Sequence, residues 1–290
     1  MRLAVVIASL GRPREVGQLI ARLERQTSPA DLVAVSVESA ADLPAQAPEY
    51  VKVAMGPRGL TAQRNRGIEL VKDGCDIIVF FDDDYLPSDQ ALAGVRALFA
   101  ARDDVAAATG RLLSDGVKTG GIDYDAAIEA LATYDRTEQP RIEIERDLDG
   151  VYGCNMAFRT SLIEDTRFDE NLPLYAWQED IDFAAQLRGR GRVVKTQAFA
   201  GVHRGVGGAR SSGVRLGYSQ IVNPLYLVRK KTMRPWFATR LIMRNFVANH
   251  VRAIAPEPWI DRAGRLRGNW IAVGDVVRGR ADPKRILGLS

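Results

Sequence analysis

The stretch "IIVFFDDDYLP", residues 77–87, decides the fold of this chain. Its five leading apolar residues predict a strand buried on both faces, as in a parallel sheet. Three aspartates, Asp82, Asp83 and Asp84, follow directly at the carboxyl end of that strand. Adjacent carboxylates repel one another and resist desolvation, so a compensating charge is expected beside them. A bound cation is the simplest candidate.

Strands and helices alternate on both sides of this stretch. Further strands are predicted at 3–8, 31–39, 50–54, 103–110 and 192–199, and helices after Pro13, after the glycine loop at 56–59 and from Pro87-Ser88. The alternation predicts a doubly wound, largely parallel α/β sheet. Ligands of such sheets bind beyond the carboxyl ends of the strands, where Ser9, Glu38 and the three aspartates fall.

The second half of the chain is less regular. Residues 111–149 interrupt the alternation, and we interpret them as a wall of the binding site. Within this region a short helix is predicted at 126–134 and an exposed strand at 141–150. A strand is predicted within 150–159, and from about Leu216 the chain reads as helical, with breaks near Pro224 and Pro235. The predicted organisation is therefore a catalytic domain over 1–215 and a mainly helical extension over 216–290.

Composition narrows the class of protein. With 46% hydrophobic and 26% charged residues among 290, the chain can bury a sizeable core. Cys75 and Cys154 form no CxxC or Cys/His cluster, which argues against a zinc site or a disulfide framework and fits a reducing compartment. No apolar run approaches the roughly 18 residues that span a bilayer, and the first apolar run is too short for a signal peptide. We expect a cytoplasmic protein, or one held peripherally on the inner face of the cytoplasmic membrane.

Charge is distributed unevenly. From Arg204 to Ser290 there are 17 Lys/Arg and 4 Asp/Glu, against 23 and 32 in the rest of the chain. Basic residues alternate with aromatic ones over 216–254, which fits contact with an anionic membrane surface. Packing of these helices on the catalytic domain or on a second subunit explains the pattern equally well. No nucleic-acid-binding motif is present, so nucleic acid is not expected as a partner.

The aspartates have the chemistry of a metal site. Alternate side chains of an extended segment face the same way, so Asp82 and Asp84 can share one ligand while Asp83 points elsewhere. Oxygen ligands suit Mg²⁺ or Mn²⁺, commonly together with phosphate oxygens. His203, at a predicted strand end, is a candidate third ligand. A solvated acidic turn and a structural histidine are the alternatives; a P-loop is absent.

A second acidic group lies in "WQEDIDF", residues 177–183. Glu179 and Asp180 fall at the predicted start of a helix, where N–H groups favour carboxylates, so first-turn acidic residues are an alternative interpretation. Trp177 and Tyr175 offer flat faces on which sugar rings pack, or they belong to the core.

Six motifs in order resemble one known family. They are "VVIASLGRP" (5–13), Glu38, "GLTAQRNRGIE" (59–69), "FFDDDYLP" (80–87), "GCNMAFR" (153–159) and "QED" (178–180). Over residues 1 to 205 the chain resembles the family 2 glycosyltransferases, nucleotide-sugar-dependent enzymes with the GT-A fold. The resemblance implies a nucleotide-sugar half over about 1–110 and an acceptor half over about 111–215.

The resemblance also implies roles for individual residues. Asp180 would be the general base, with Glu179 beside it, and Asp84 and His203 would ligate Mn²⁺ or Mg²⁺. The implied donor-binding residues are Ser9, Arg12, Glu38, Arg64, Asp82 and Asp83, and the acceptor contacts are Asn155 and Trp177. Glu38 stands where the family usually has an aspartate, which bears on the choice of base. Arg204 and Arg210 are candidates to clamp the donor phosphates.

The expected function is metal-dependent, inverting transfer of a sugar from a nucleoside-diphosphate sugar to a hydroxyl group. A sugar or lipid-linked acceptor and a place in bacterial polysaccharide or glycolipid synthesis are implied, and an oligomer is compatible with the sequence. One alternative is a sugar-phosphate nucleotidylyltransferase, for which "SLGRPRE" (9–15) lacks the GxGxR-type loop. The other is a non-catalytic binding module, in which Asp84 or Asp180 would be dispensable.

Overall fold

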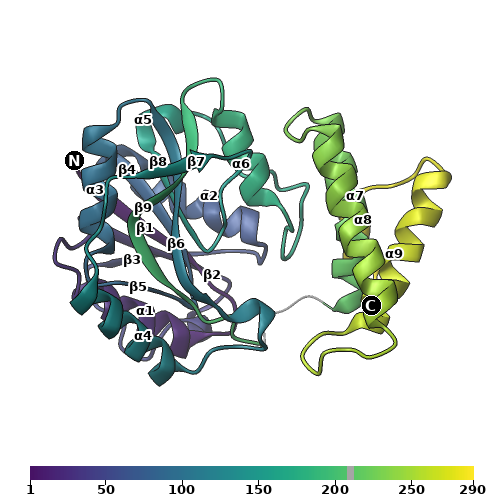
Figure 1. Ribbon diagram of the computed structural model, residues 1–290, viewed down its shortest axis with the longest axis horizontal. Coiled ribbons are helices and arrows are strands. Elements are labelled where there is room, and N and C mark those ends of the chain that lie inside the picture. The colour runs from purple at the N-terminus through teal and green to yellow at the C-terminus, as the bar shows by residue number, and fades with distance from the viewer. Residues whose placement is uncertain (208–211) are drawn as a thin grey trace.

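A computed structural model describes residues 1–207 and 212–290. Across these residues, nine strands form one sheet that runs through the larger part of the molecule (Figure 1). Its main path is β3-β2-β1-β4-β8-β6-β9-β5, and β7 pairs with β9. The strands are β1 (Leu3–Ala8), β2 (Leu32–Val37), β3 (Val51–Met55), β4 (Ile77–Asp82), β5 (Tyr85–Pro87), β6 (Val105–Asp115), β7 (Ile144–Asp147), β8 (Asn155–Arg159) and β9 (Arg192–His203).

The first four strands of this path are parallel, as the alternation predicts. β1 pairs in parallel with β2 and β4, and β2 pairs in parallel with β3. β8 then enters between β4 and β6 and is antiparallel to both. Ser9 and the three aspartates therefore meet at one edge of the sheet, where β1 and β4 end side by side.

Helices cover both faces of the sheet. α1 (Pro13–Glu24) and α3 (Ala91–Ala101) pack on one face through side chains such as Leu19 and Leu98. α2 (Leu60–Val71), α5 (Thr160–Ile163) and α6 (Glu179–Leu187) pack on the other, through Ile68 and Phe183 among others. The prediction that Pro87-Ser88 opens a helix is wrong, because Pro87 ends β5, which pairs with β9 before α3 begins.

The helix predicted at 126–134 and the exposed strand predicted at 141–150 are confirmed as α4 (Tyr124–Thr137) and β7. β6 continues to Asp115, and η3 (Gly116–Lys118), α4 and β7 follow. β6 and β9 run in parallel as far as the pair Asp115 and His203. The extension of β6 thus carries Asp115 to the same edge of the sheet as the aspartates.

The C-terminal part consists of α7 (Gly213–Arg229), α8 (Pro235–Arg252), α9 (Arg262–Val277) and η4 (Pro283–Gly288). The predicted break at Pro235 is confirmed, since α8 begins there. The predicted break at Pro224 is wrong: α7 continues through this buried proline. Burial of α7 against α9 and α8 outweighs the one backbone hydrogen bond that a proline removes.

These helices attach to the sheet-containing part through its loop before α6. Leu172 and Ala176 of that loop share an apolar cluster with Leu227 and Leu241 of α7 and α8. Asn223 donates its side-chain N–H to the carbonyl oxygen of Trp177, 2.9 Å away. The extension is thereby joined to the segment that carries the second acidic motif.

Candidate active site

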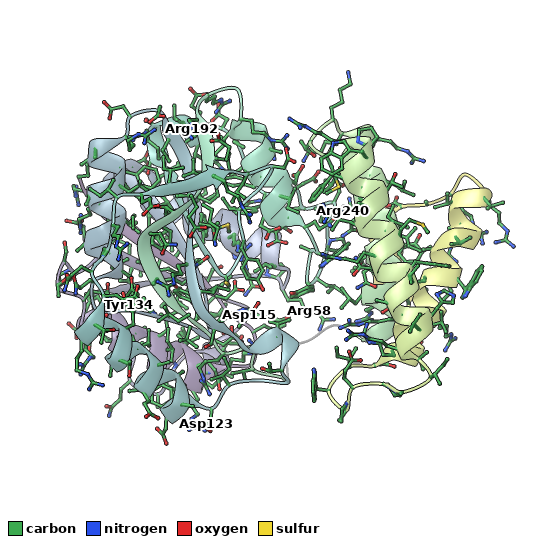
Figure 2. The ribbon with its side chains drawn as sticks, viewed as in Figure 1. Arg58, Asp115, Asp123, Tyr134, Arg192 and Arg240 are labelled. Carbon is green, nitrogen blue, oxygen red and sulfur yellow. The ribbon has the colours of Figure 1, made fainter. Side chains whose placement is uncertain are left out.

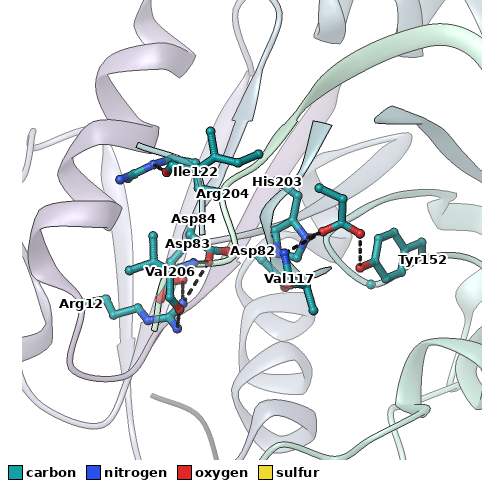
Figure 3. A network of polar contacts seen from close by, with 12 residues as sticks. Arg12, Asp82, Asp83, Asp84, Val117, Ile122, Tyr152, His203, Arg204 and Val206 are labelled. Atoms are coloured by element: carbon teal, nitrogen blue, oxygen red, sulfur yellow. Dashed lines mark hydrogen bonds and ion pairs between the residues drawn. The ribbon is translucent and has the colours of Figure 1, made fainter. Parts of the chain in front are cut away.

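A metal-ligand set lies at the carboxyl end of β4. Asp82 ends this strand, Asp84 follows two residues later, and His203 ends β9 beside them. One ligand atom from each residue lies within 4.8 Å of the other two (Figure 3). Two carboxylates and an imidazole suit a hard or borderline divalent ion such as Mn²⁺, so these residues fit a metal.

Asp115 orients the imidazole of His203. The Nδ1 atom of His203 lies 3.0 Å from Asp115 Oδ1, and its Nε2 atom lies 3.3 Å from Asp84 Oδ1. The hydroxyl group of Tyr152 donates to the other oxygen of Asp115 at 3.1 Å. Burial disfavours the charged imidazolium, yet Cys154 and these two carboxylates together raise the pKa of His203. A carboxylate behind a metal-binding histidine fixes the ring and directs the other nitrogen toward the ion.

Asp83 faces away from the metal-ligand set, as its place between two ligands predicts. Its Oδ2 atom accepts from the Ser9 hydroxyl group at 2.6 Å, and its Oδ1 atom lies 2.8 Å from Arg12 Nη1. Burial raises the pKa of Asp83 to about 7, against the attraction of Arg12. Asp83 therefore ties the loop after β1 to the end of β4.

A short segment after β9 covers the metal-ligand set. The backbone N–H of Val206 donates to Asp84 Oδ2 at 2.7 Å, and Arg12 Nη2 donates to the Val206 carbonyl at 2.5 Å. Burial would raise the pKa of Asp84, but His203, Arg12 and this N–H together lower it. Arg204 donates to Gln18 at 2.8 Å, and Arg210 lies outside the described residues.

The second acidic motif begins α6 and is linked to the first by Arg64. This buried guanidinium pairs with Glu179 through Nη1 and lies 2.9 Å from Asp82 Oδ1 through Nη2. Burial raises the pKa of Glu179 to about 8, and the adjacent charge of Asp180 adds to this effect. Arg64 thus connects the metal-ligand set to the ED motif, and its partner Glu179 is 115 residues away in sequence.

Asp180 has different partners from Glu179. Its Oδ2 atom accepts from the Gly153 N–H and its Oδ1 atom from the Ile181 N–H, both at 2.8 Å. Burial raises the pKa of this carboxyl group, although the two N–H groups and Arg64 oppose the change. An aspartate with a raised pKa and no direct ion pair among the described residues is suited to accept a proton.

The loop that follows β2 is held by a residue that sequence reasoning missed. Glu38 is exposed just beyond β2, whereas Asp42 is buried and accepts from the Gly11 N–H at 2.6 Å. Gln63 of α2 donates to the carbonyl oxygens of Ser9 and Ser36 at 2.6 and 3.0 Å. Asp42 and Gln63 therefore shape the loops beside the predicted nucleotide site. The "SAAD" stretch at 39–42, typical of a capping box, is the sequence signal for Asp42.

The two acceptor candidates lie in different surroundings. Asn155 has no exposed surface, and its Oδ1 atom accepts from Thr109 at 2.7 Å, so its position does not fit contact with an acceptor. Trp177 is half-buried beside the ED motif. Tyr175 is 49% exposed and lies between Leu174 and Ala176, which have left-handed backbone conformations with φ of 59° and 51°. Such strain is frequent at binding sites, so Tyr175 is the better placed aromatic residue.

Comparison with known proteins identifies the family and the fold. The family model described as glycosyl transferase family 2 matches residues 4–167. No curated protein matches the chain. The fold is GT-A-like, a mixed, mostly parallel sheet followed by C-terminal helices. The family match defines the protein as a glycosyltransferase. The chain belongs to glycosyl transferase family 2.

Solved structures share the fold at low sequence identity. Staphylococcus aureus TarS, residues 1–349, aligns with 15% identity and a TM-score of 0.58, over 100% of this chain and 83% of that one. A mannosyltransferase from Pyrobaculum calidifontis, solved with GDP-Man and Mn²⁺, aligns with 14% identity and a TM-score of 0.50, over 99% and 85%. GalNAc-T7, solved with UDP, GalNAc and Mn²⁺, aligns with 11% identity and a TM-score of 0.52, over 100% and 56%.

Proposed function

We propose that this glycosyltransferase moves a sugar from a nucleoside-diphosphate sugar to an acceptor hydroxyl group with inversion at the anomeric carbon, using Mn²⁺ or Mg²⁺. One observation carries the proposal: Arg64 connects a metal-ligand set, Asp82, Asp84 and His203, to the ED motif, in which Asp180 makes no direct ion pair among the described residues. A bound divalent ion would stabilise the negative charge of the departing nucleoside diphosphate.

The remaining roles in catalysis and donor binding belong to side chains of the protein. Asp180 takes the proton of the acceptor hydroxyl group as that oxygen bonds to the anomeric carbon. Arg64, through its contacts with Glu179 and Asp82, holds the start of α6 beside the end of β4. Ser9, Arg12 and Asp83 hold the loop beside the donor, and Asp42 rather than the exposed Glu38 is the carboxylate that fixes this loop. Tyr175 and Trp177 are proposed to pack against sugar rings near Asp180.

The proposed acceptor, pathway and cellular location are those that the sequence implies. We propose a sugar or lipid-linked acceptor, a role in bacterial polysaccharide or glycolipid synthesis, and a cytoplasmic location, including the inner face of the cytoplasmic membrane. The division into a catalytic domain over 1–215 and an extension over 216–290 belongs to the same proposal. Among the residues described, no helix is both long and apolar enough to cross a bilayer.

The test is release of nucleoside diphosphate from a panel of donors. TarS has been solved with UDP-GlcNAc and the Pyrobaculum enzyme with GDP-Man, so UDP-, GDP- and dTDP-sugars are tried first, with Mn²⁺, Mg²⁺ or EDTA. We expect slow release from one donor, abolished by EDTA and by Asp84→Ala. Calorimetric titration with the same nucleotides runs in parallel. Absence of both release and binding would overturn the proposal, and binding without release under every condition would favour a non-catalytic module.

The released product distinguishes a glycosyltransferase from a sugar-phosphate nucleotidylyltransferase. A nucleotidylyltransferase would release pyrophosphate from a nucleoside triphosphate and a sugar phosphate, so pyrophosphate is assayed beside nucleoside diphosphate. Family membership favours the transferase. Once an acceptor is found, the coupling constant of the anomeric proton in the product distinguishes inversion from retention.

A further inference from the structure

Helix α8 exposes one continuous face that is apolar and basic. Trp236, Met243, Val247 and Val251 are 55%, 53%, 50% and 64% exposed, and Arg240 and Arg244 are exposed between them. With 3.6 residues per turn, all six side chains fall on one side of the helix. The opposite side is covered, because Ala238, Leu241 and Asn249 are buried against the neighbouring helices. We call the six exposed residues the outer face of α8.

The charge of this face has a single sign. No Asp or Glu occurs in α8, whereas Arg240, Arg244 and Arg252 do. Within 1–207 and 212–290, Arg240 and Arg244 have no carboxylate partner, while Arg252 pairs with Glu257. Trp270 of α9 is 56% exposed and lies beside α8, where its indole N–H donates to His250 at 3.1 Å. Unpaired guanidinium groups among exposed apolar side chains call for an occupant that is both anionic and apolar.

We propose that the outer face of α8 binds the surface of an anionic phospholipid bilayer, with the helix lying in the plane of the interface. Arg240 and Arg244 reach lipid phosphates, and the apolar residues and Trp236 enter the boundary of the acyl chains. A second copy of the chain is disfavoured as the occupant, because a two-fold contact through this face would set arginine against arginine. The inference does not depend on the proposed chemistry.

The active-site edge lies toward the C-terminal helices. Figure 2 shows Arg240 on α8 in the C-terminal part, and Asp115 and Arg58 on the side of the larger part that faces the C-terminal helices. Asp115 belongs to the metal-ligand environment through His203. The metal-ligand environment therefore lies on the side of the larger part that faces the C-terminal helices (Figure 2).

Vesicle flotation with the full chain tests this proposal. The probes are vesicles of phosphatidylcholine alone and vesicles of phosphatidylcholine with phosphatidylglycerol. One variant replaces Met243, Val247 and Val251 with serine, and a second replaces Arg240 and Arg244 with glutamine. The matched control replaces Val53 and Met55 with serine, because these residues are 37% and 54% exposed on β3, away from α8. Circular dichroism and thermal unfolding confirm that each variant is folded.

We expect the wild-type chain to bind the anionic vesicles, to bind neutral ones far less, and to be released by high salt. Each α8 variant should lower the partition coefficient about tenfold or more, while the β3 control leaves it unchanged. Failure to bind anionic vesicles, or equal binding by all variants, would overturn the proposal. So would an oligomer in sedimentation velocity that the α8 variants dissociate without any vesicle binding, which would identify a second copy as the occupant. Calorimetric donor binding is measured on the same samples and reports on the proposed function separately.

Discussion

The ammonium group of Lys230 lies 2.7 Å from the Oδ2 atom of Asp182, a residue with no exposed surface. The same ammonium group lies 2.7 Å from Asp169. Lys230 follows α7, and Asp182 lies two residues beyond the proposed base, Asp180. This ion pair joins the C-terminal extension to the helix that carries the ED motif.

Substitution Lys230→Met should destabilise the protein and slow catalysis. The buried carboxylate of Asp182 would lose its cation, which we expect to lower the free energy of unfolding by about 2–3 kcal/mol. Urea unfolding measures the loss, and kcat reports on the position of Asp180. The control is Lys72→Met, which removes a surface pair with Glu69 and should cost less than about 1 kcal/mol. Equal losses in the two variants would contradict this role for Lys230.

Substitution Asp180→Asn should lower kcat by about 10²–10⁴-fold, because the amide cannot take a proton from the acceptor. Donor affinity should change little, since Asp180 accepts only backbone N–H groups within the described chain. Steady-state kinetics and calorimetric donor titration separate the two effects. Asp165→Asn alters an exposed carboxylate and serves as the control. A large loss of donor affinity in Asp180→Asn would instead assign Asp180 to the donor site.

The pH dependence of the rate should report the state of Asp180. A base is active when deprotonated, so kcat falls as pH falls through the pKa of this group. Because burial raises the pKa of Asp180, the acidic limb should lie above the ordinary aspartate value of about 3.9. The profile is recorded at saturating donor and metal ion, and the limb should be absent from the residual rate of Asp180→Asn. A limb at or below the ordinary value would contradict a desolvated base.

The pH dependence of stability should have the opposite sign to that of kcat, because of Glu179. Its pKa rises from 4.5 in the unfolded chain to about 8 in the folded one. The folded state therefore holds this proton more tightly, and the stabilisation it gives is complete below about 4.5 and lost as pH rises toward 8. Chemical unfolding between pH 5 and 8 should show a decline in stability that is smaller in Glu179→Gln. Identical slopes for the two proteins would contradict the raised pKa.

Substitution His203→Ala should weaken Mn²⁺ binding by about 10–100-fold, measured by calorimetry in the presence of nucleotide. The chain has two histidines, and His250 provides a matched control because it lies on α8 beside Trp270. His250→Ala should leave Mn²⁺ affinity unchanged. Unaltered affinity in His203→Ala would restrict the metal-ligand set to the aspartates.

Much of the fold and part of the active site could be predicted from the local pattern of apolar and charged residues. The run before Asp82 required a buried strand, and the spacing of the aspartates correctly separated Asp83 from the other two. Asp115 was missed because Gly110 and Arg111 interrupt the apolar run, so the predicted strand ends at Gly110, five residues before β6 does. The break predicted at Pro224 was wrong because proline is disfavoured inside a helix by its local geometry, whereas the burial of α7 depends on contacts with distant residues of α9.

The strand–helix alternation, the two acidic motifs and the basic C-terminal extension can be read from the sequence, because apolar periodicity and charge are properties of short stretches. Which charges meet depends on the three-dimensional fold. Arg64 lies between Asp82 and Glu179, and His203 lies between Asp84 and Asp115. These partners are far apart along the chain, and their pairing depends on the order of strands in the sheet. Burial then makes each pairing necessary, because an isolated charge at these positions would lose the solvation that water gives it.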